Sequence, residues 1–125
     1  MKTADVIIVG SGASGLFNAL FLPQDYKVIV ITKKEVEESD SFLAQGGISA
    51  LKNPEDYDSY FEDTMKAGHY ENDKGAVEKM IKESPQIIQD LKDFGVRFDL
   101  KDGEIEFTRE GGHSTFRILH HEDLT

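Results

Sequence analysis

The sequence predicts an α/β fold that begins with a strand-helix-strand unit. Two short apolar runs, Val6–Val9 and Val28–Ile31, are rich in β-branched residues, as expected of parallel strands buried on both faces. Between them lies a glycine-rich turn, followed by apolar residues at helical spacing, Leu16, Ala19 and Leu20. A strand, a turn, a helix and a second strand within about 30 residues make one βαβ unit.

The turn in this unit carries the pattern Gly10-x-Gly12-x-x-Gly15, directly after a strand and at the start of a helix. Gly10 permits the tight turn, Gly12 lets the backbone approach a pyrophosphate, and Gly15 lets the helix pack close to the strand. The helix N-terminus also presents free N–H groups to phosphates. In this context the pattern predicts a Rossmann-like, dinucleotide-binding fold rather than a merely structural turn.

The end of the second strand departs from the usual dinucleotide pattern. An acid normally stands there and holds the ribose hydroxyls, whereas this chain has Thr32 and Lys33, and Glu35 comes too late. The departure weakens an interpretation as an NAD site. Lys33 could instead contact the adenosine ribose or a phosphate, or it could be a solvated residue at a strand end.

The next segment, residues 33–51, has no convincing period and ends in a glycine pair, so it is either a functional loop or disordered. Asn53 and Pro54 then look like the N-cap and first residue of a helix. Gly68 is its expected C-terminal stop. The side chains that this helix should bury are Tyr57, Tyr60, Phe61, Thr64 and Met65.

A second helical pattern follows and closes at Gly95. Pro85 lies inside it, so we expect a kink or two abutting helices, with Ser84 as the second N-cap. Residues 96–99 and 104–108 then alternate apolar and polar residues around Asp102-Gly103, which predicts a hairpin. The buried positions of the second helical pattern should be Val77, Met80, Ile81, Ile87, Ile88, Leu91 and Phe94.

Composition excludes several classes of protein. The 14 Lys and Arg residues against 24 Asp and Glu residues give a formal net charge of −10, which argues against binding to nucleic acid or to an anionic membrane surface. Without cysteine there is no disulfide, thiol nucleophile or zinc-thiolate site. We find no signal peptide and no apolar run long enough to span a membrane, so we expect a cytoplasmic protein.

Two irregular segments carry candidate site residues. Residues 39–48 combine small residues with a glycine pair, which suits close approach of the backbone to a flat ligand, although a flexible loop is equally compatible. Residues 108–120 place Arg109, Glu110, His113 and Arg117 around another glycine pair, which suggests a polar site for a charged ligand, or else a solvated loop. The histidines lack metal-binding spacing, and we predict no metal.

With these three segments in order, the chain closely resembles the L-aspartate oxidase family, within the fumarate reductase/succinate dehydrogenase flavoprotein superfamily. The resemblance runs through essentially the whole chain, and the closing stretch TREGGHSTFRILHHEDLT is its most specific part. Covalent members of the superfamily carry a His where this chain has Asp40, so the resemblance implies FAD held without a covalent bond. The residues implied to contact FAD are Gly10, Ser11, Gly12, Ala13, Ser14, Lys33, Asp40, Ser41, Phe42, Leu43, Ala44, Gln45, Gly46 and Gly47.

The resemblance also implies a reaction. A hydride would pass from the α-carbon of L-aspartate to flavin N5, giving iminoaspartate, and oxygen or fumarate would reoxidise the flavin. Iminoaspartate would then go to quinolinate synthase for NAD biosynthesis. Glu110 stands where succinate dehydrogenase flavoproteins carry an aromatic residue, and a carboxylate there favours a substrate with an α-ammonium group. We therefore expect Glu110 to orient the substrate.

The same resemblance sets expectations about domains. Residues 1–125 would be the N-terminal part of an FAD-binding domain. The remaining strands of that domain, a capping domain with the family's acid/base Arg and a C-terminal helical domain would be absent, so we expect this chain to be inactive alone. One alternative is a fumarate reductase or succinate dehydrogenase flavoprotein, against which Asp40 and Glu110 argue. Another is a nucleotide-binding or interaction module only.

Overall fold

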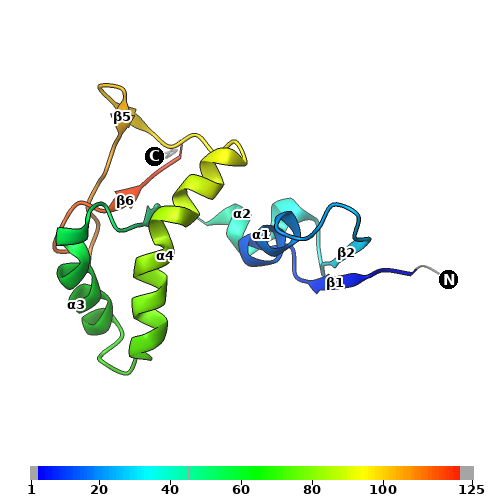
Figure 1. The fold of residues 1–125 in the computed structure, drawn as a ribbon, viewed down its shortest axis with the longest axis horizontal. Coiled ribbons are helices and arrows are strands. Elements are labelled where there is room, and N and C mark those ends of the chain that lie inside the picture. Colours follow the sequence, from blue (N-terminus) through cyan, green and yellow to red (C-terminus); the bar gives the residue numbers. More distant parts are fainter. Residues whose placement is uncertain (1–2, 45, 122–125) are drawn as a thin grey trace. The chain divides into compact units, whose positions relative to one another are not determined.

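The computed structural model describes residues 3–44 and 46–121 (Figure 1). The chain divides into two compact units, Met1–Gln45 and Gly46–Thr125. The first unit is α/β, and the second combines two long helices with short strands. The predicted α/β class is confirmed. Within the described residues, no helix is long and apolar enough to cross a membrane.

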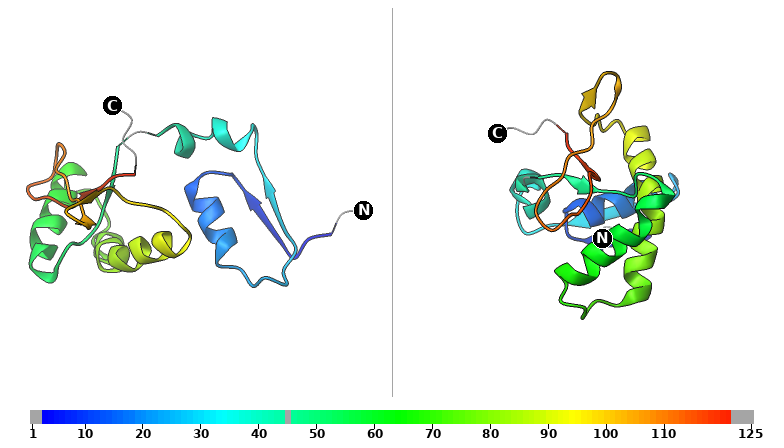
Figure 2. Two further views of the ribbon diagram at one scale, coloured as in Figure 1. Left: turned by 90° about the horizontal axis from the view of Figure 1, so that it is seen from above. Right: turned by 90° about the vertical axis from the view of Figure 1, so that its left-hand side faces the viewer.

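The first unit is the predicted βαβ unit. β1 (Val6–Val9) and β2 (Val28–Ile31) are parallel, with Val6 opposite Val28 and Val9 opposite Ile31. The helix between them, α1 (Ala13–Leu20), packs against β1 (Figure 2). The two strands therefore end together, at the edge where the glycine turn begins.

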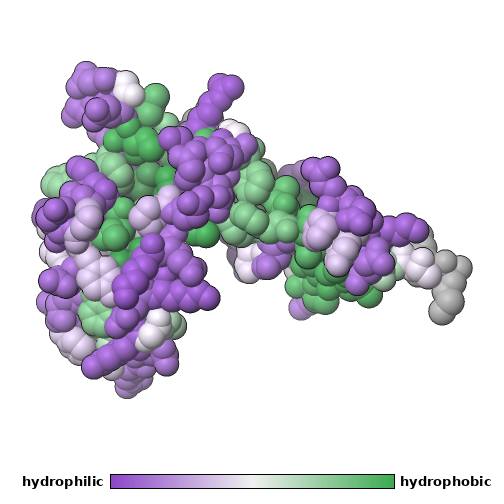
Figure 3. Space-filling view, in the orientation of Figure 1, coloured by the Kyte–Doolittle hydropathy of each residue, from purple (hydrophilic) through white to green (hydrophobic). Residues whose placement is uncertain are grey.

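Burial of the strands on both faces was predicted, and this prediction is wrong for the described chain. Residues on alternate positions of β1 are exposed, Ile7 at 59% and Val9 at 83%, and Ile31 of β2 is 50% exposed. The reason is that α1 covers one face of this two-stranded sheet and no described element of the unit covers the other. Figure 3 shows the resulting apolar patch over β1.

This patch leads us to expect that the 125-residue chain self-associates in solution, because an open sheet edge and an uncovered apolar face both favour intermolecular contacts. Size-exclusion chromatography with light scattering should give a mass above that of the monomer. A variant with Ile7→Thr and Val9→Thr keeps strand propensity and should shift the mass towards the monomer. A monodisperse, cooperatively melting monomer of the unmodified chain would refute the expectation.

Residues 33–44 are more regular than their sequence predicts. They contain a short 3₁₀ helix, Val36–Glu38, and the single-turn helix α2 (Asp40–Leu43). The Ser39 hydroxyl caps α2 by accepting a hydrogen bond from Phe42 N at 3.3 Å. Single turns held by one cap are too short to produce a detectable apolar period.

The second unit begins its helices where the sequence indicates. Asn53 Oδ1 accepts a hydrogen bond from Asp56 N at 3.1 Å, which caps the 3₁₀ turn Pro54–Asp56 that leads into α3 (Tyr57–Ala67). Gly68 ends α3, as predicted. A Cβ at Gly68 would collide with the end of the Asn72 side chain, which would have to move, whereas the φ of Gly68, −88°, is open to any residue.

The next helix, α4 (Lys74–Asp93), is continuous through Pro85, so the prediction of two abutting helices with Ser84 as an N-cap is wrong. Figure 1 shows this helix bending along its length. Pro85 has no N–H for the carbonyl of Ile81, and Ser84 Oγ donates to that carbonyl instead, at 2.7 Å. The same Oγ accepts a hydrogen bond from Leu51 N at 2.9 Å.

The strands of the second unit form two separate two-stranded sheets, β3 with β6 and β4 with β5. β6 (Ile118–Leu119) is buried and pairs antiparallel with β3 (Ile48–Ser49), while Thr108 bridges to Ile118. The predicted turn at Asp102-Gly103 and a strand within residues 104–108, β5 (Glu104–Ile105), are confirmed. The predicted first strand, residues 96–99, is wrong, because the strand that pairs with β5 is β4 (Leu100–Lys101). Its turn residues have positive φ, 55° at Asp102 and 86° at Gly103. This geometry matches the type I′ turns that favour two-residue hairpins.

Two apolar clusters form the core of this unit. One cluster joins Ile88 of α4 to Leu119 of β6, together with Ala50 and Phe98. The other lies between α3 and α4 and consists of Tyr60, Met65, Val77 and Ile81. The predicted core positions Met80 and Phe94 are instead 47% and 44% exposed, and Phe94 follows the last residue of α4 as its C-cap.

Candidate functional site

A groove of about 570 Å³ lies at the carboxyl ends of β1 and β2. Ligands of open α/β sheets bind at this edge, where the strands end and the glycine turn begins. The groove is therefore positioned for a nucleotide. It is lined by Val9, Gly10, Ser11, Gly12, Ile31, Thr32, Lys33, Lys34, Glu35, Glu38, Ser39, Asp40 and Ser41.

The glycine turn has the geometry that pyrophosphate binding requires. Gly10 has φ of 114°, a conformation that side-chain-bearing residues rarely adopt. A Cβ on Gly15 would collide with the carbonyl oxygen of Gly10, so glycine is what lets α1 start this close to β1. The first turn of α1 contains no acid, and its N-terminus can thus attract a phosphate without a competing carboxylate.

Two hydroxyl groups fasten the walls of the groove. Ser11 is buried, and its Oγ donates to Thr32 Oγ1 at 2.9 Å, which links the glycine turn to the end of β2. Ser41 Oγ accepts a hydrogen bond from Ala13 N at 2.9 Å, which holds α2 against the start of α1. Segments 28 residues apart in the sequence thus form one wall.

The structure brings part of the predicted FAD set together in this groove. Ala13 and Ser14 begin α1 without lining the groove, and Gln45 lies outside the described residues. Glu35, judged too late from its spacing, does line it, because the chain turns around the end of β2. The predicted residues in the groove are Gly10, Ser11, Gly12, Lys33, Asp40 and Ser41, whereas Phe42, Leu43 and Ala44 are exposed and do not line it.

The predicted substrate residue, Glu110, belongs to a polar cluster in the second unit. Glu110 Oε1 lies 2.9 Å from His120 Nε2, and His120 Nδ1 lies 3.1 Å from Thr108 Oγ1. The His120 side chain is 10% exposed and that of Glu110 is 49% exposed. An adjacent hollow of about 320 Å³ is lined by Asp99, Glu106, Thr108, Arg109, Glu110 and His120.

Gly47, predicted to contact FAD, lies against this cluster. A Cβ on Gly47 would collide with the Ile118 side chain and would lie 2.5 Å from the carbonyl oxygen of Leu119 and 2.9 Å from His120 Nε2. Gly46 has φ of 104° and open space around it. The glycine pair thus lets the backbone pass directly beside the imidazole that contacts Glu110, a proximity that no local pattern in the sequence indicates.

Arg117, which the sequence indicates only as one charge among several, is completely buried. Its guanidinium forms a two-pronged pair with Asp56, with Nε to Oδ2 at 2.8 Å and Nη2 to Oδ1 at 2.7 Å, and Nη1 contacts Asp63 Oδ2 at 2.6 Å. It also lies over the Tyr60 ring, 4.8 Å from the centroid. Further hydrogen bonds link the guanidinium to Ser59, Thr115 and His113.

This network shifts the ionisation of its acids. Hydrogen bonding from Arg117 holds the pKa of Asp56 well below its ordinary value, against the opposing effect of burial, and Ser59 and Thr115 add to the lowering. Burial alone would raise the pKa of Asp63, but hydrogen bonds from Arg117 and Ser114 lower it overall. Arg117 in turn has a raised pKa, chiefly through its hydrogen bonds to Asp56. All three groups therefore remain charged at neutral pH.

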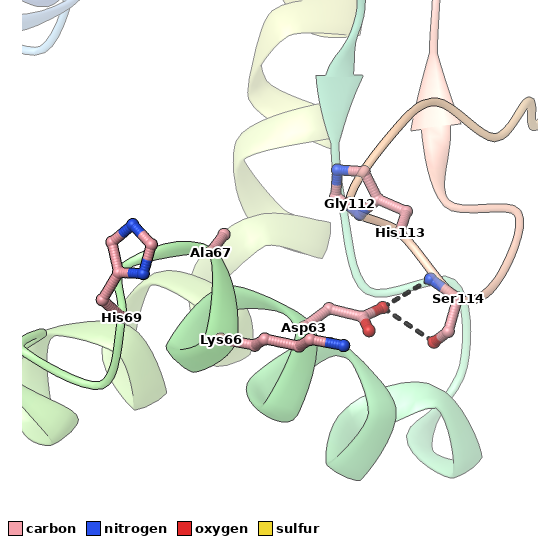
Figure 4. A pocket seen from close by; sticks show the side chains of 7 residues that line it. All are labelled: Asp63, Lys66, Ala67, His69, Gly112, His113 and Ser114. Atoms are coloured by element: carbon pink, nitrogen blue, oxygen red, sulfur yellow. Dashed lines mark hydrogen bonds between the residues drawn. The ribbon is translucent and has the colours of Figure 1, made fainter.

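A separate hollow of about 470 Å³ lies beside this network (Figure 4). Its acid is Asp63, whose Oδ2 accepts hydrogen bonds from Ser114 N and Ser114 Oγ, both at 2.7 Å. Lys66, His69 and His113 also line the hollow. Ser114 and Arg117 both bond to the same oxygen of Asp63, Oδ2, so the carboxylate in the hollow is already engaged through that oxygen. Within residues 3–44 and 46–121, no group of acids and histidines is arranged to hold a metal ion.

A βαβ unit with a glycine turn at a helix start and a groove at the strand ends defines a dinucleotide-binding protein. Comparison with known families specifies the class further. The model of the FAD binding domain family matches residues 5–123, and this chain belongs to that family. The cofactor of this family is FAD.

The chain is also similar to curated proteins named L-aspartate oxidase. It is 44% identical over 124 residues to that of Clostridium perfringens, covering 99% of this chain, and 45% identical over 122 residues to that of Clostridium acetobutylicum, covering 97%. The chain spans 28% of the length of each of these relatives.

Two solved structures are similar to this chain at lower sequence identity. Mycobacterium smegmatis Sdh1 in complex with UQ1 superposes with a TM-score of 0.83 and 31% identity, covering 99% of this chain and 22% of that one. A mutant form of E. coli quinol fumarate reductase FrdA gives a TM-score of 0.83 and 26% identity, covering 93% of this chain and 21% of that one. The fold of this chain is therefore shared with both of these structures.

Proposed function

We propose that the protein to which this chain belongs oxidises L-aspartate to iminoaspartate with FAD, using oxygen or fumarate as electron acceptor. The observation that carries the proposal is the carboxylate of Glu110, held beside Gly47 in a chain 44% identical to an L-aspartate oxidase. We place the reaction in the cytoplasm, as the first step of NAD biosynthesis, with iminoaspartate passing to quinolinate synthase.

The groove residues would hold the cofactor without a covalent bond. The backbone at Gly10 and Gly12, with the N-terminus of α1, would bind the pyrophosphate, and Lys33 would contact the adenosine end. Asp40, which lines the groove, has no imidazole nitrogen with which to form a histidyl link. Bound FAD would supply the acceptor for the hydride that leaves the substrate α-carbon.

Glu110 would select and orient the substrate. A carboxylate that is half exposed can accept a charge-assisted hydrogen bond from an α-ammonium group. Succinate and fumarate lack this group and gain nothing from the contact. The proposed role is therefore selective for the amino acid.

Glu110→Gln in the full-length enzyme tests the proposal. Because a hydrogen bond to a charged group contributes about 1.5–3 kcal/mol, we expect kcat/KM for aspartate to fall roughly 10- to 150-fold. Fumarate reduction should suffer much less. Steady-state kinetics with both substrates measures the two effects, and flavin absorbance controls for cofactor content. Equal losses would indicate a folding defect, and no loss for either substrate would exclude Glu110 from the site.

A second candidate, a fumarate reductase or succinate dehydrogenase flavoprotein, is supported by the solved structures, which match at 0.83 TM-score. Fumarate reduction is common to both candidates and cannot separate them. Oxidation of succinate in place of aspartate by the full-length protein would favour the second. A third reading, a nucleotide-binding module without catalysis, would require that the full-length protein binds FAD and oxidises neither acid.

A further inference from the structure

The imidazole of His120 connects two side chains of the Glu110 cluster. Its Nε2 lies 2.9 Å from Glu110 Oε1 and its Nδ1 lies 3.1 Å from Thr108 Oγ1. A carboxylate can only accept hydrogen bonds, so His120 Nε2 carries a proton and donates a hydrogen bond to Glu110. The Thr108 hydroxyl can then donate to Nδ1 of a neutral ring, or accept from it if the ring is charged. His120 therefore keeps its bond to Glu110 in either protonation state.

His120 is itself held rigidly. It follows β6 directly, its backbone oxygen accepts a hydrogen bond from Asp99 N at 2.9 Å, and it is 9% exposed. Glu110 is in a different situation, because it lies in an exposed loop after Thr108 and its side chain is 49% exposed. A free glutamate in such a loop samples several rotamers, and a fixed donor selects among them.

We propose that His120 is the positioning residue for Glu110, an inference that rests on the proposed function. Its Nε2–H holds one carboxylate oxygen, Oε1, and thereby fixes the direction of the other. In the described part of the chain, that second oxygen has no hydrogen-bond partner, so it is available to the α-ammonium group of an amino-acid substrate. Gly47 makes this arrangement possible, because any side chain there would approach His120 Nε2.

Three variants of the full-length enzyme separate positioning from packing. His120→Gln can place an amide N–H near the position of Nε2, and it should retain the bond to Glu110. His120→Asn is shorter and reaches only the position of Nδ1, so it should keep the contact with Thr108 and lose the contact with Glu110. The double variant His120→Asn with Glu110→Gln tests whether the two residues act together.

We expect His120→Asn to lower kcat/KM for aspartate about tenfold, as the loss of one hydrogen bond to a charged group predicts. Fumarate reduction and FAD affinity should change by less than about twofold. A general loss of packing would lower these two quantities as well, so they distinguish a packing defect from a loss of positioning. His120→Gln should restore most of the aspartate activity. In the double variant, aspartate activity should be no lower than in Glu110→Gln alone.

Other results overturn the inference and identify what failed. Equal losses for aspartate and fumarate in His120→Asn, or equal behaviour of the Asn and Gln variants, would show that His120 has only a structural role. Additive losses in the double variant would show that it acts independently of Glu110. If Glu110→Gln alone leaves aspartate kinetics unchanged, the proposed role of Glu110 fails first, and the positioning role of His120 is rejected with it.

Discussion

Replacing Arg117 with Met should lower the free energy of unfolding by about 3–5 kcal/mol, the effect of removing one partner from a buried ion pair. Met preserves much of the side-chain length, but it leaves Asp56, 9% exposed, and Asp63 without their shared cation. Most proteins are stable by only about 5–15 kcal/mol, so the second unit should be largely unfolded under mild denaturant.

Urea denaturation followed by circular dichroism measures this change. Arg97→Met is the matched control, because Arg97 is exposed and its replacement should alter stability by less than about 0.5 kcal/mol. Arg117→Lys retains the charge but cannot form the two-pronged pair with Asp56. Its stability should lie between those of Arg117→Met and Arg97→Met. Similar denaturation midpoints for Arg117→Met and Arg97→Met would contradict the central role of this network.

The same network predicts how stability depends on pH. Asp56 and Asp63 have lowered pKa values in the folded protein, so their contribution is fully present above the ordinary aspartate value of about 3.9. Below that value the unfolded chain takes up protons first, and the free energy of unfolding should fall as the pH decreases further. In Arg117→Met, burial instead favours the protonated forms of Asp56 and Asp63. The difference in the free energy of unfolding between this variant and the unmodified protein should therefore become smaller as the pH decreases.

Gly12→Val should weaken FAD binding by the full-length protein about 5- to 150-fold, since filling a closely packed contact with branched atoms costs about 1–3 kcal/mol and each 1.4 kcal/mol is about tenfold in affinity. Gly12 is the N-cap of α1, and its φ of −73° is accessible to any residue, so the backbone itself tolerates the change. A Cβ there would lie 3.0 Å from Ser41 Oγ. The added methyl groups would occupy the space in which the backbone approaches the pyrophosphate.

Flavin titration of the refolded apoprotein measures the loss, and circular dichroism establishes that the variant is folded. Gly12→Ala adds a single carbon, which a shift of Ser41 Oγ by a few tenths of an ångström can accommodate, and it should show a smaller effect. Gly75→Ala in the first turn of α4 is the control, because a Cβ there meets only the Asp73 carboxylate, at 3.3 Å. Near-normal affinity in Gly12→Val would refute the assignment of the groove.

Local signals in the sequence were sufficient for the order of elements in the βαβ unit and for the start and end of α3. The glycine turn, the two β-branched runs and the Asn53-Pro54 cap each act over a few residues, and each appears where it was predicted. At Pro85 the sequence allowed a kink or two helices, and only the two-helix alternative is wrong, because the missing N–H of Pro85 is compensated by the Ser84 hydroxyl. The sequence pattern indicates the hydrogen bond that Pro85 removes from the helix, but it does not show that the Ser84 hydroxyl replaces it.

The site required contacts that sequence reasoning cannot supply. Gly47 and His120 are far apart in the chain, and they meet only because β3 pairs with β6. Likewise, Arg117 finds Asp56 and Asp63 on α3 and the turn before it, at separations of 61 and 54 residues. The residue types predicted polar chemistry in this segment. Only the pairing of strands determines which side chains touch.

The hydroxyl of Ser84 has a consequence for how this sequence can evolve. It serves both the Ile81 carbonyl, left open by Pro85, and the amide of Leu51. If Ser84 is lost first, two backbone groups lose their partner, at about 1–3 kcal/mol for each that is buried. If Pro85 is lost first, the new residue brings an N–H that can donate to the Ile81 carbonyl. The Ser84 hydroxyl is then needed only to accept the hydrogen bond from Leu51 N. The order of mutation therefore matters, and among related proteins a proline at this position should co-occur with a serine or threonine immediately before it.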